Sequence, residues 1–192
     1  MTPESARSLL GSILTLAYSG ELGAIRAYVG HRHALRDYGQ KLQVRRIVED
    51  EVRHRRRVGE MLVTLELAPD PYREWKMNAV GQTISVVCHL FGWFIPMWGA
   101  GRLEAQNIVE YEHAARLAKL AGLEDWVEDL LHMAEVEWDH ELYFRSQAES
   151  HWLWHVFPRW TVPPPRELIR QEYARFEKTG EAPQLIRHLV VR

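Results

Sequence analysis

Two short stretches of the chain each place a glutamate three residues before a histidine. EDEVRH (residues 49–54) contains Glu51 and His54, and EVEWDH (residues 135–140) contains Glu137 and His140. Residues three apart lie on one face of an α-helix, so the carboxylate and the imidazole of each pair can bind a common centre. Carboxylate oxygens combined with imidazole nitrogens suit iron or manganese better than a closed structural zinc site. The repeated spacing therefore predicts a metal centre, provided that helices bring the two pairs together.

Capping and helix-breaking residues divide the chain into long helices. Thr2 and Pro3 are suited to begin the first helix, and Ala121-Gly122 to end the third. We expect four long helices and one short charged helix, at about residues 3–36, 42–67, 102–120, 124–150 and 166–178. Short turns after the first and third helices make each pair antiparallel, and a long apolar stretch at 68–101 makes one crossover connection.

Each long helix carries apolar residues at alternating three- and four-residue steps, which is typical of the core-facing stripe of a helical bundle. Acidic and imidazole side chains interrupt these stripes. They are Glu21, Glu51, His54, Glu110, Glu137 and His140. Burying an unpaired carboxylate costs several kcal/mol, so these groups require a partner within the core.

Sequence distance from the turns predicts which glutamates lie at one level. In an antiparallel pair, Glu21 and Glu51 are equidistant from the first turn, and Glu110 and Glu137 from the second. By this criterion Glu110 is a better candidate than its neighbours Glu104 and Glu112. Four carboxylates and two imidazoles are the ligand set of ferritin-like di-iron and di-manganese proteins. We therefore predict an all-α, ferritin-like four-helix bundle over residues 1–150, with a C-terminal extension at 151–192.

Two more residues near these stripes have alternative roles. His113 shares a face with Glu110, which makes it either an additional metal ligand or a core histidine. Tyr28 lies on the stripe of Glu21, about 10 Å along the helix, and is either a redox-active or substrate-contacting tyrosine or part of the core.

Composition excludes several other classes of protein. The net charge of the 192-residue chain is −2, which predicts no general attraction to nucleic acid, and the basic run RHRRR (53–57) fits a solvated helix face. Cys88 is the only cysteine, which excludes a disulfide within the chain and favours a reducing compartment. The N-terminus has no signal-peptide pattern, and the apolar stretch at 84–100 contains a proline that disfavours a simple membrane-spanning helix.

With these residues in place, the chain resembles the demethoxyubiquinone hydroxylase family of di-iron monooxygenases. SGELGAIRAYVG (19–30) is similar to the segment around that family's first metal glutamate. EDEVRH and EVEWDH match its two Glu-x-x-His elements, and VEYEH (109–113) corresponds to the start of its third-helix site. The resemblance covers about residues 10–147 and leaves the aromatic, proline-rich extension without a counterpart.

The resemblance implies two bound iron ions, with manganese as the alternative, and O2-dependent hydroxylation of a quinone-like or other apolar aromatic substrate. It also implies an external electron donor, a cytoplasmic location and peripheral contact of residues 84–100 with the cell membrane, and it is compatible with a homo-oligomer. Two other functions remain open. A rubrerythrin- or bacterioferritin-like oxidase, peroxidase or ferroxidase uses the same six ligands. A non-enzymatic, metal-stabilised bundle would dock on a membrane or protein through Trp93, Trp98 and the aromatic residues of 152–160.

Overall fold

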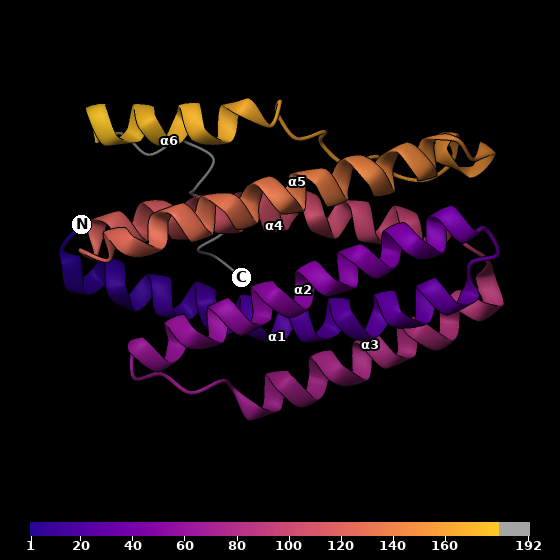
Figure 1. The fold of residues 1–192 in the computed structure, drawn as a ribbon, viewed down its shortest axis with the longest axis horizontal. Helices are drawn as coiled ribbons and strands as arrows, with labels where there is room; N and C mark the ends of the chain where they lie inside the picture. The colour runs from indigo at the N-terminus through magenta and orange to yellow at the C-terminus, as the bar shows by residue number, and fades with distance from the viewer. Residues whose placement is uncertain (181–192) are drawn as a thin grey trace.

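A computed structural model describes residues 1–180, which form helices and no β-strand (Figure 1). Residues 181–192, the end of the predicted extension, lie outside the described part. The α-helices are α1 (Pro3–Ala34), α2 (Tyr38–Thr64), α3 (Pro71–Phe91), α4 (Phe94–Leu120), α5 (Val127–Glu149) and α6 (Glu167–Thr179). Two 3-10 turns, η1 (Glu124–Trp126) and η2 (Trp152–His155), precede and follow α5. The prediction of an all-α fold is confirmed.

Side-chain caps determine where the first three helices begin. Thr2 accepts a hydrogen bond from the amide of Ser5 at 3.2 Å, and Pro3 is the first residue of α1, as predicted. Asp37 accepts a hydrogen bond from the amide of Gln40 at 2.8 Å and starts α2 four residues earlier than expected.

The crossover connection is itself a helix, which the sequence prediction missed. Asp70 caps α3 by accepting hydrogen bonds from two backbone amides, and Gly92, with φ of 74°, ends the segment. The next helix, α4, then begins at Phe94 rather than near Arg102. Pro96 is tolerated there because the amides of the first helical turn have no intrahelical acceptor.

The helices form two antiparallel pairs with additional helices on the outside (Figure 1). The α1–α2 pair lies beside the α4–α5 pair, α3 packs along α1, and α6 lies over α4 and α5. Close contact between α1 and α3 requires glycine. A Cβ atom added to Gly81 would lie 2.5 Å from the carbonyl oxygen of Gly23, and one added to Gly30 would overlap Ser85.

The apolar core consists of two clusters separated by a polar level. On α1, one cluster contains Leu10 and Leu14, the other contains Tyr28 and Leu35, and Glu21 lies between them. The other three bundle helices show the same interruption. The two clusters therefore shield this polar level from solvent along the bundle axis.

Arginines of the basic run pair with acidic groups of the chain. Arg55 forms an ion pair with Glu74 of α3, and its guanidinium lies 3.7 Å from the centre of the Tyr18 ring on α1. Arg57 donates to Asp129 of α5 at 2.7 Å. These cations connect α2 to its neighbours.

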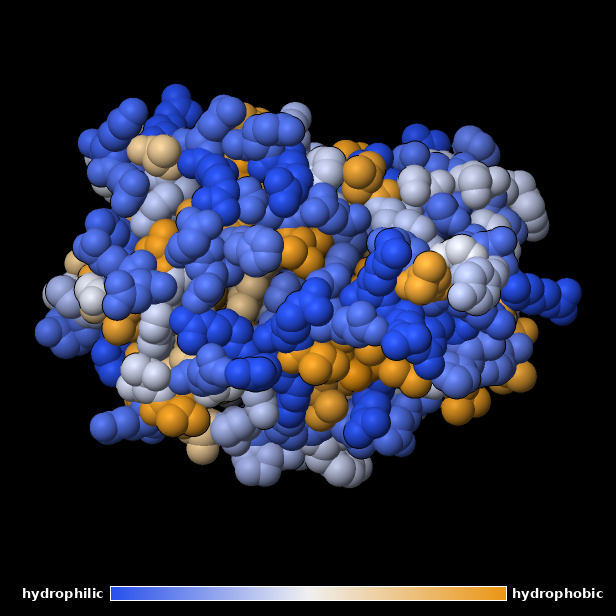
Figure 2. Space-filling model, viewed as in Figure 1, coloured by the Kyte–Doolittle hydropathy of each residue, from blue (hydrophilic) through white to orange (hydrophobic). Residues whose placement is uncertain are grey.

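The surface is mostly hydrophilic on the face shown in Figure 2, with apolar side chains scattered among the hydrophilic ones. Large apolar side chains of α3 are exposed, among them Trp75, Val86 and Leu90. Within residues 1–180, α1 is the one helix with the length and composition of a membrane span. It packs against α2, α3 and α4.

Candidate metal centre

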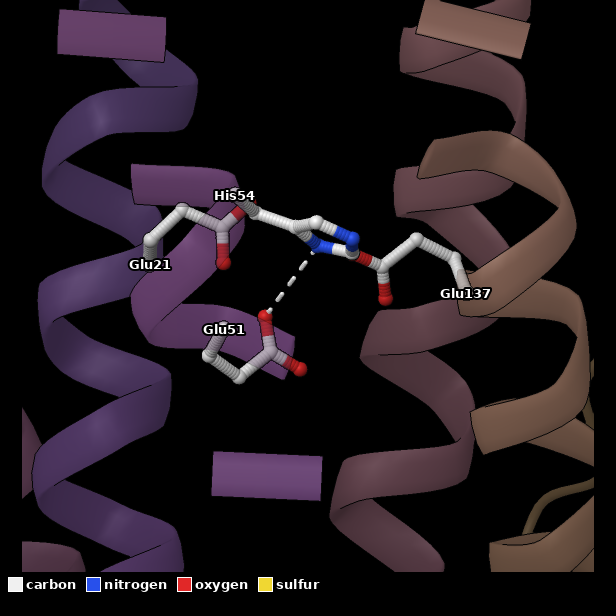
Figure 3. Close-up of side chains that lie close together, drawn as sticks. All are labelled: Glu21, Glu51, His54 and Glu137. Atoms are coloured by element: carbon white, nitrogen blue, oxygen red, sulfur yellow. Dashed lines mark hydrogen bonds and ion pairs between the residues drawn. The ribbon is translucent and has the colours of Figure 1, made fainter. Parts of the chain in front are cut away.

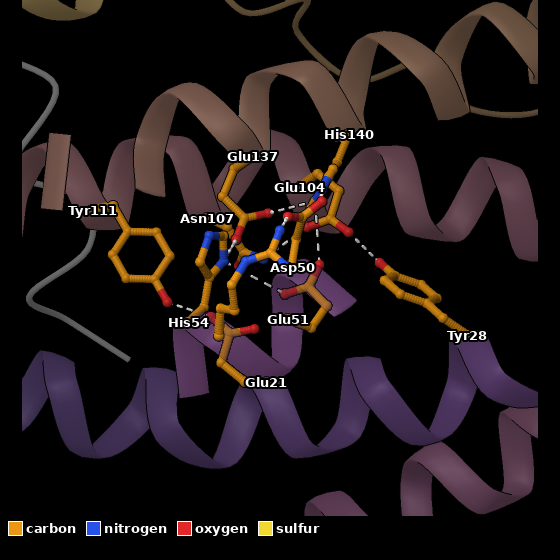
Figure 4. Close-up of polar contacts among 11 residues, drawn as sticks. Glu21, Tyr28, Asp50, Glu51, His54, Glu104, Asn107, Tyr111, Glu137 and His140 are labelled. Carbon is orange, nitrogen blue, oxygen red and sulfur yellow. Dashed lines mark hydrogen bonds and ion pairs between the residues drawn. The ribbon is translucent and has the colours of Figure 1, made fainter. Parts of the chain in front are cut away.

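Six buried side chains from four helices lie at the polar level between the two apolar clusters. They form two overlapping groups, and within each group one ligand atom per residue lies within 4.8 Å of the others. The first group is Glu21, Glu51, His54 and Glu137, shown in Figure 3. The second is Glu51, Glu104, Glu137 and His140, shown within its wider network in Figure 4. Glu51 and Glu137 belong to both groups, as carboxylates that bridge two metal ions would.

Both imidazoles face the two shared carboxylates. His54 Nδ1 lies 3.0 Å from Glu137 Oε1 and 3.8 Å from Glu51 Oε2. His140 Nδ1 lies 3.2 Å from Glu51 Oε1 and 3.5 Å from Glu137 Oε2. On the other side of its ring, His140 Nε2 is 3.2 Å from Asp50 Oδ2. A carboxylate in that position fixes the orientation of a ligating histidine.

Five of these side chains are the predicted ones, and the sixth is Glu104 instead of the predicted Glu110. Glu110 belongs to neither group, because the buried face of α4 runs through Glu104, Ile108 and Tyr111. Glu110 lies six positions after Glu104. Its side chain therefore points about 120° away from that of Glu104 around the helix axis. Equal sequence distance from the turn does not identify the α4 residue, because the α4–α5 connection is asymmetric. It contains η1, and the sequence midpoint between Glu104 and Glu137 falls at the end of α4.

A tyrosine pattern in the sequence distinguishes Glu104 from Glu110. Tyr28 follows Glu21 by seven residues, and Tyr111 follows Glu104 by the same spacing. Two helical turns place each tyrosine on the face of its glutamate. In the structure each hydroxyl donates to the glutamate of the opposite helix, Tyr28 to Glu104 and Tyr111 to Glu21 (Figure 4).

This reciprocal arrangement predicts separable effects of two conservative substitutions. Tyr111→Phe removes the hydrogen bond to Glu21, and Tyr28→Phe removes the one to Glu104. We expect each to weaken one of two metal sites about 10- to 100-fold and to leave the other nearly unchanged. Metal titration followed by calorimetry measures this. Tyr143→Phe is the matched control, because the Tyr143 hydroxyl has no hydrogen-bond partner. Equal effects of all three substitutions would contradict the assignment.

Several ligand atoms at this level lack hydrogen-bond partners. They are Glu21 Oε2, both carboxylate oxygens of Glu51, Glu137 Oε2 and His140 Nδ1. Buried polar atoms in native proteins are nearly all paired. Within residues 1–180, no lysine or arginine forms an ion pair with Glu21, Glu51, Glu104 or Glu137. The donor set and its unpaired atoms therefore fit metal cations.

The surroundings raise the pKa values of two of the four glutamates and lower those of the other two. Burial raises the pKa values of Glu21 and Glu104 well above the usual range, and the nearby Glu51 and Glu137 carboxylates raise them further. Burial also acts to raise the pKa of Glu51, but its close contacts with Glu21 and with the two imidazoles outweigh burial and lower that pKa. The hydrogen bond with His54 and the close contact with His140 likewise outweigh burial and lower the pKa of Glu137.

The surroundings of the two imidazoles favour their protonated forms. Burial acts to lower the pKa of His54, but its hydrogen bond with Glu137 and its proximity to Glu51 raise it to about 9. For His140 burial is likewise outweighed, here by its hydrogen bond with Asp50 and its close contacts with Glu137 and Glu51, so its pKa is also raised. In the metal-free centre these shifts favour protons on Glu21, Glu104 and both imidazoles, and ionised carboxylates at Glu51 and Glu137.

A small apolar cavity of about 190 Å³ adjoins this centre through Tyr28. Its wall also includes His31, Val87, Cys88 and Leu103, contributed by α1, α3 and α4. Neither ring nitrogen of His31 has a hydrogen-bond partner, and burial lowers the pKa of this histidine to about 4. The imidazole of His31 is therefore neutral at pH 7, and the cavity favours an uncharged occupant.

His113, the alternative ligand considered above, lies outside both groups. It is buried and lines a different cavity, beneath the C-terminal extension.

No protein-family model, curated protein or solved structure matches the chain. What the centre can bind therefore follows from its own residues, which form two groups of four that share two carboxylates.

Proposed function

We propose that this chain is a ferritin-like four-helix bundle that binds two iron ions, or two manganese ions, in a carboxylate-bridged centre. The ligands would be Glu21, Glu51, His54, Glu104, Glu137 and His140. The observation that carries the proposal is the presence of Glu51 and Glu137 in both groups. Oxygen-rich ligand sets with two imidazoles suit redox-active iron or manganese.

The activity that this site supports best is O2-dependent hydroxylation of an apolar aromatic substrate, quinone-like in character. A bound metal pair would supply the electrons that activate O2. Glu51 and Glu137 would contribute ligands to both metal ions, and Glu21 and Glu104 would each contribute a ligand to one of them. The apolar clusters would exclude water from the centre. Insertion of one oxygen atom while the other leaves as water consumes two electrons and two protons, so an external electron donor is part of the proposal.

Tyr28 links the proposed substrate cavity to the centre. Its ring lines the apolar cavity, and its hydroxyl donates to Glu104. It would hold Glu104 in position and form the cavity wall nearest the reaction. Ile84 and Val87 of α3 also line the cavity. The same helix exposes Trp75, Val86 and Leu90 to solvent. We place a peripheral contact with the cytoplasmic face of the membrane on α3, which would deliver an apolar substrate to this cavity.

One observation favours a second candidate, a ferroxidase or a small-substrate oxidase or peroxidase. The cavity volume of about 190 Å³ is below the range of about 300–1,000 Å³ that is usual for ligand pockets. Such an enzyme would use the same six ligands without a large organic substrate.

A matched pair of valine substitutions distinguishes these activities. Val87 lines the cavity, whereas its neighbour Val86 is 63% exposed and does not. With iron-loaded protein, a reductant, ¹⁸O₂ and a hydrophobic quinone analogue, we expect ¹⁸O in the hydroxylated product. Val87→Phe should lower product formation at least about tenfold with unchanged oxidation of iron, because an added ring fills the cavity. Val86→Phe should have no effect. Rapid oxidation of iron without hydroxylated product would favour the ferroxidase instead.

A further inference from the structure

A second cavity, of about 330 Å³, lies between α4, α5 and the C-terminal extension, and the proposed function does not use it. Its apolar walls come from Ile108 and Val109 of α4, Trp138 of α5 and the run Pro163–Pro165. The Trp138 indole N–H donates to the carbonyl oxygen of Pro164 at 2.7 Å, which holds the proline segment over the opening. This volume is at the lower end of the range for small-molecule pockets.

Two buried basic side chains in the cavity wall each have a nitrogen atom without a hydrogen-bond partner. His113 and Arg116 are 5% and 4% exposed, and His113 Nδ1 and Arg116 Nε have no hydrogen-bond partner. The terminal nitrogens of Arg116 reach a single acceptor, Glu112 Oε2, at 3.4 Å. A guanidinium group has five donors, and burial without strong acceptors is costly. The cavity wall therefore contains an unpaired guanidinium N–H beside apolar side chains.

Glu112 is a weak partner that an incoming group can replace. Its distance of 3.4 Å from both Arg116 nitrogens is long for a charge-assisted hydrogen bond, and its side chain is 21% exposed. Burial also raises the pKa of Glu112, more strongly than Arg116 lowers it. The other carboxylate in the wall, Glu172, pairs with Arg175 at 3.5 Å.

We propose that this cavity is a binding site for a small apolar carboxylic acid, a medium-chain fatty acid or an aromatic acid. The carboxylate accepts two hydrogen bonds from Arg116 in place of Glu112, and Glu112 turns toward solvent. The apolar body lies between Ile108, Val109 and the proline segment. A planar guanidinium binds a carboxylate through two parallel hydrogen bonds, which no alcohol or amine reproduces.

Calorimetric titration of the full chain with decanoate, 2-naphthoate and decanol tests the proposal. We expect one molecule of decanoate or of 2-naphthoate to bind per chain. The ligand that binds more tightly shows whether the cavity fits an alkyl chain or an aromatic ring. Decanol should bind at least tenfold more weakly than decanoate. Carboxylates that bind no more tightly than decanol would overturn the proposal, because the cavity would then be an unspecific apolar crevice.

Two substitutions act in opposite directions and so separate binding from folding. Arg116→Met should weaken decanoate binding at least tenfold, whereas Glu112→Gln should tighten it several-fold by removing the competing carboxylate. Arg45→Met is the control, since Arg45 forms an exposed pair with Glu49 at the same four-residue spacing. If Glu112→Gln does not tighten binding and Arg116→Met does not weaken it, Arg116 does not hold the ligand. Metal content should be unchanged in all three variants, so this test is independent of the dinuclear centre.

Discussion

Replacing Glu51 with glutamine should remove both metal ions from the chain, whereas replacing Glu104 should remove only one. The difference follows from the geometry, because the Glu51 carboxylate belongs to both ligand groups and the Glu104 carboxylate to one. Loss of an orienting partner outside the ligand shell costs about 10- to 100-fold in metal affinity, so loss of a ligand should cost at least about 100-fold. The metal-to-protein ratio after gel filtration reports the result directly.

The matched control for this experiment is Glu110→Gln. Glu110 is on the same helix but belongs to neither group, so this variant should retain both ions. Glu104→Gln is a mild change for the metal-free fold, because burial raises the pKa of the Glu104 carboxyl and so favours its neutral form. Its circular dichroism and thermal stability without metal should match those of the unaltered chain. Retention of two ions by Glu104→Gln together with loss of one by Glu110→Gln would reverse the assignment.

Loading the centre with two divalent ions at pH 7 should release protons. Burial favours the protonated forms of Glu21 and Glu104, and contact with Glu51 and Glu137 favours the protonated forms of His54 and His140. Metal ligands must be deprotonated, so the ions displace the protons that these groups hold. Two divalent cations then face four carboxylates, so their charges balance.

Proton release makes metal affinity strongly dependent on pH. The pKa of His54 in the metal-free chain is about 9, so its proton is present and must be displaced at every pH below that value. Affinity should therefore rise with pH below that value, about tenfold per pH unit for each proton that an ion displaces. Calorimetry in buffers of different ionisation enthalpy counts the protons. Metal affinity that is independent of pH, or release of less than one proton per ion, would contradict this charge assignment.

Five of the six side chains at the centre could be predicted because their signal is local. The Glu-x-x-His pairs of α2 and α5 place both ligands on one face whatever the surrounding fold. Glu21 stands out because it interrupts the apolar stripe of a helix with clear capping residues. Each prediction required only helical periodicity and the cost of burying a charge.

Glu104 and α3 were missed because they depend on tertiary arrangement. The apolar run at 84–100 continues across the boundary between α3 and α4 at Gly92. The start of α4 and its buried face therefore could not be predicted from the periodicity of apolar residues. The position of the extension likewise follows from distant contacts. Trp160 donates to Glu141 at 2.9 Å, and Trp98 donates to the carbonyl oxygen of Pro158 at 3.0 Å. No pattern near either tryptophan indicates its partner.

The most direct test is the anomalous diffraction of crystals of the full chain loaded anaerobically with Fe²⁺. Two peaks are expected at the level of Glu51 and Glu137, roughly 3.5–4 Å apart as in other two-metal sites. Both shared carboxylates should contact both peaks, with Glu21 and His54 on one side and Glu104 and His140 on the other. A single peak, or none under conditions of excess iron, would contradict a dinuclear centre and leave these six residues as a proton-balanced polar level in a structural bundle.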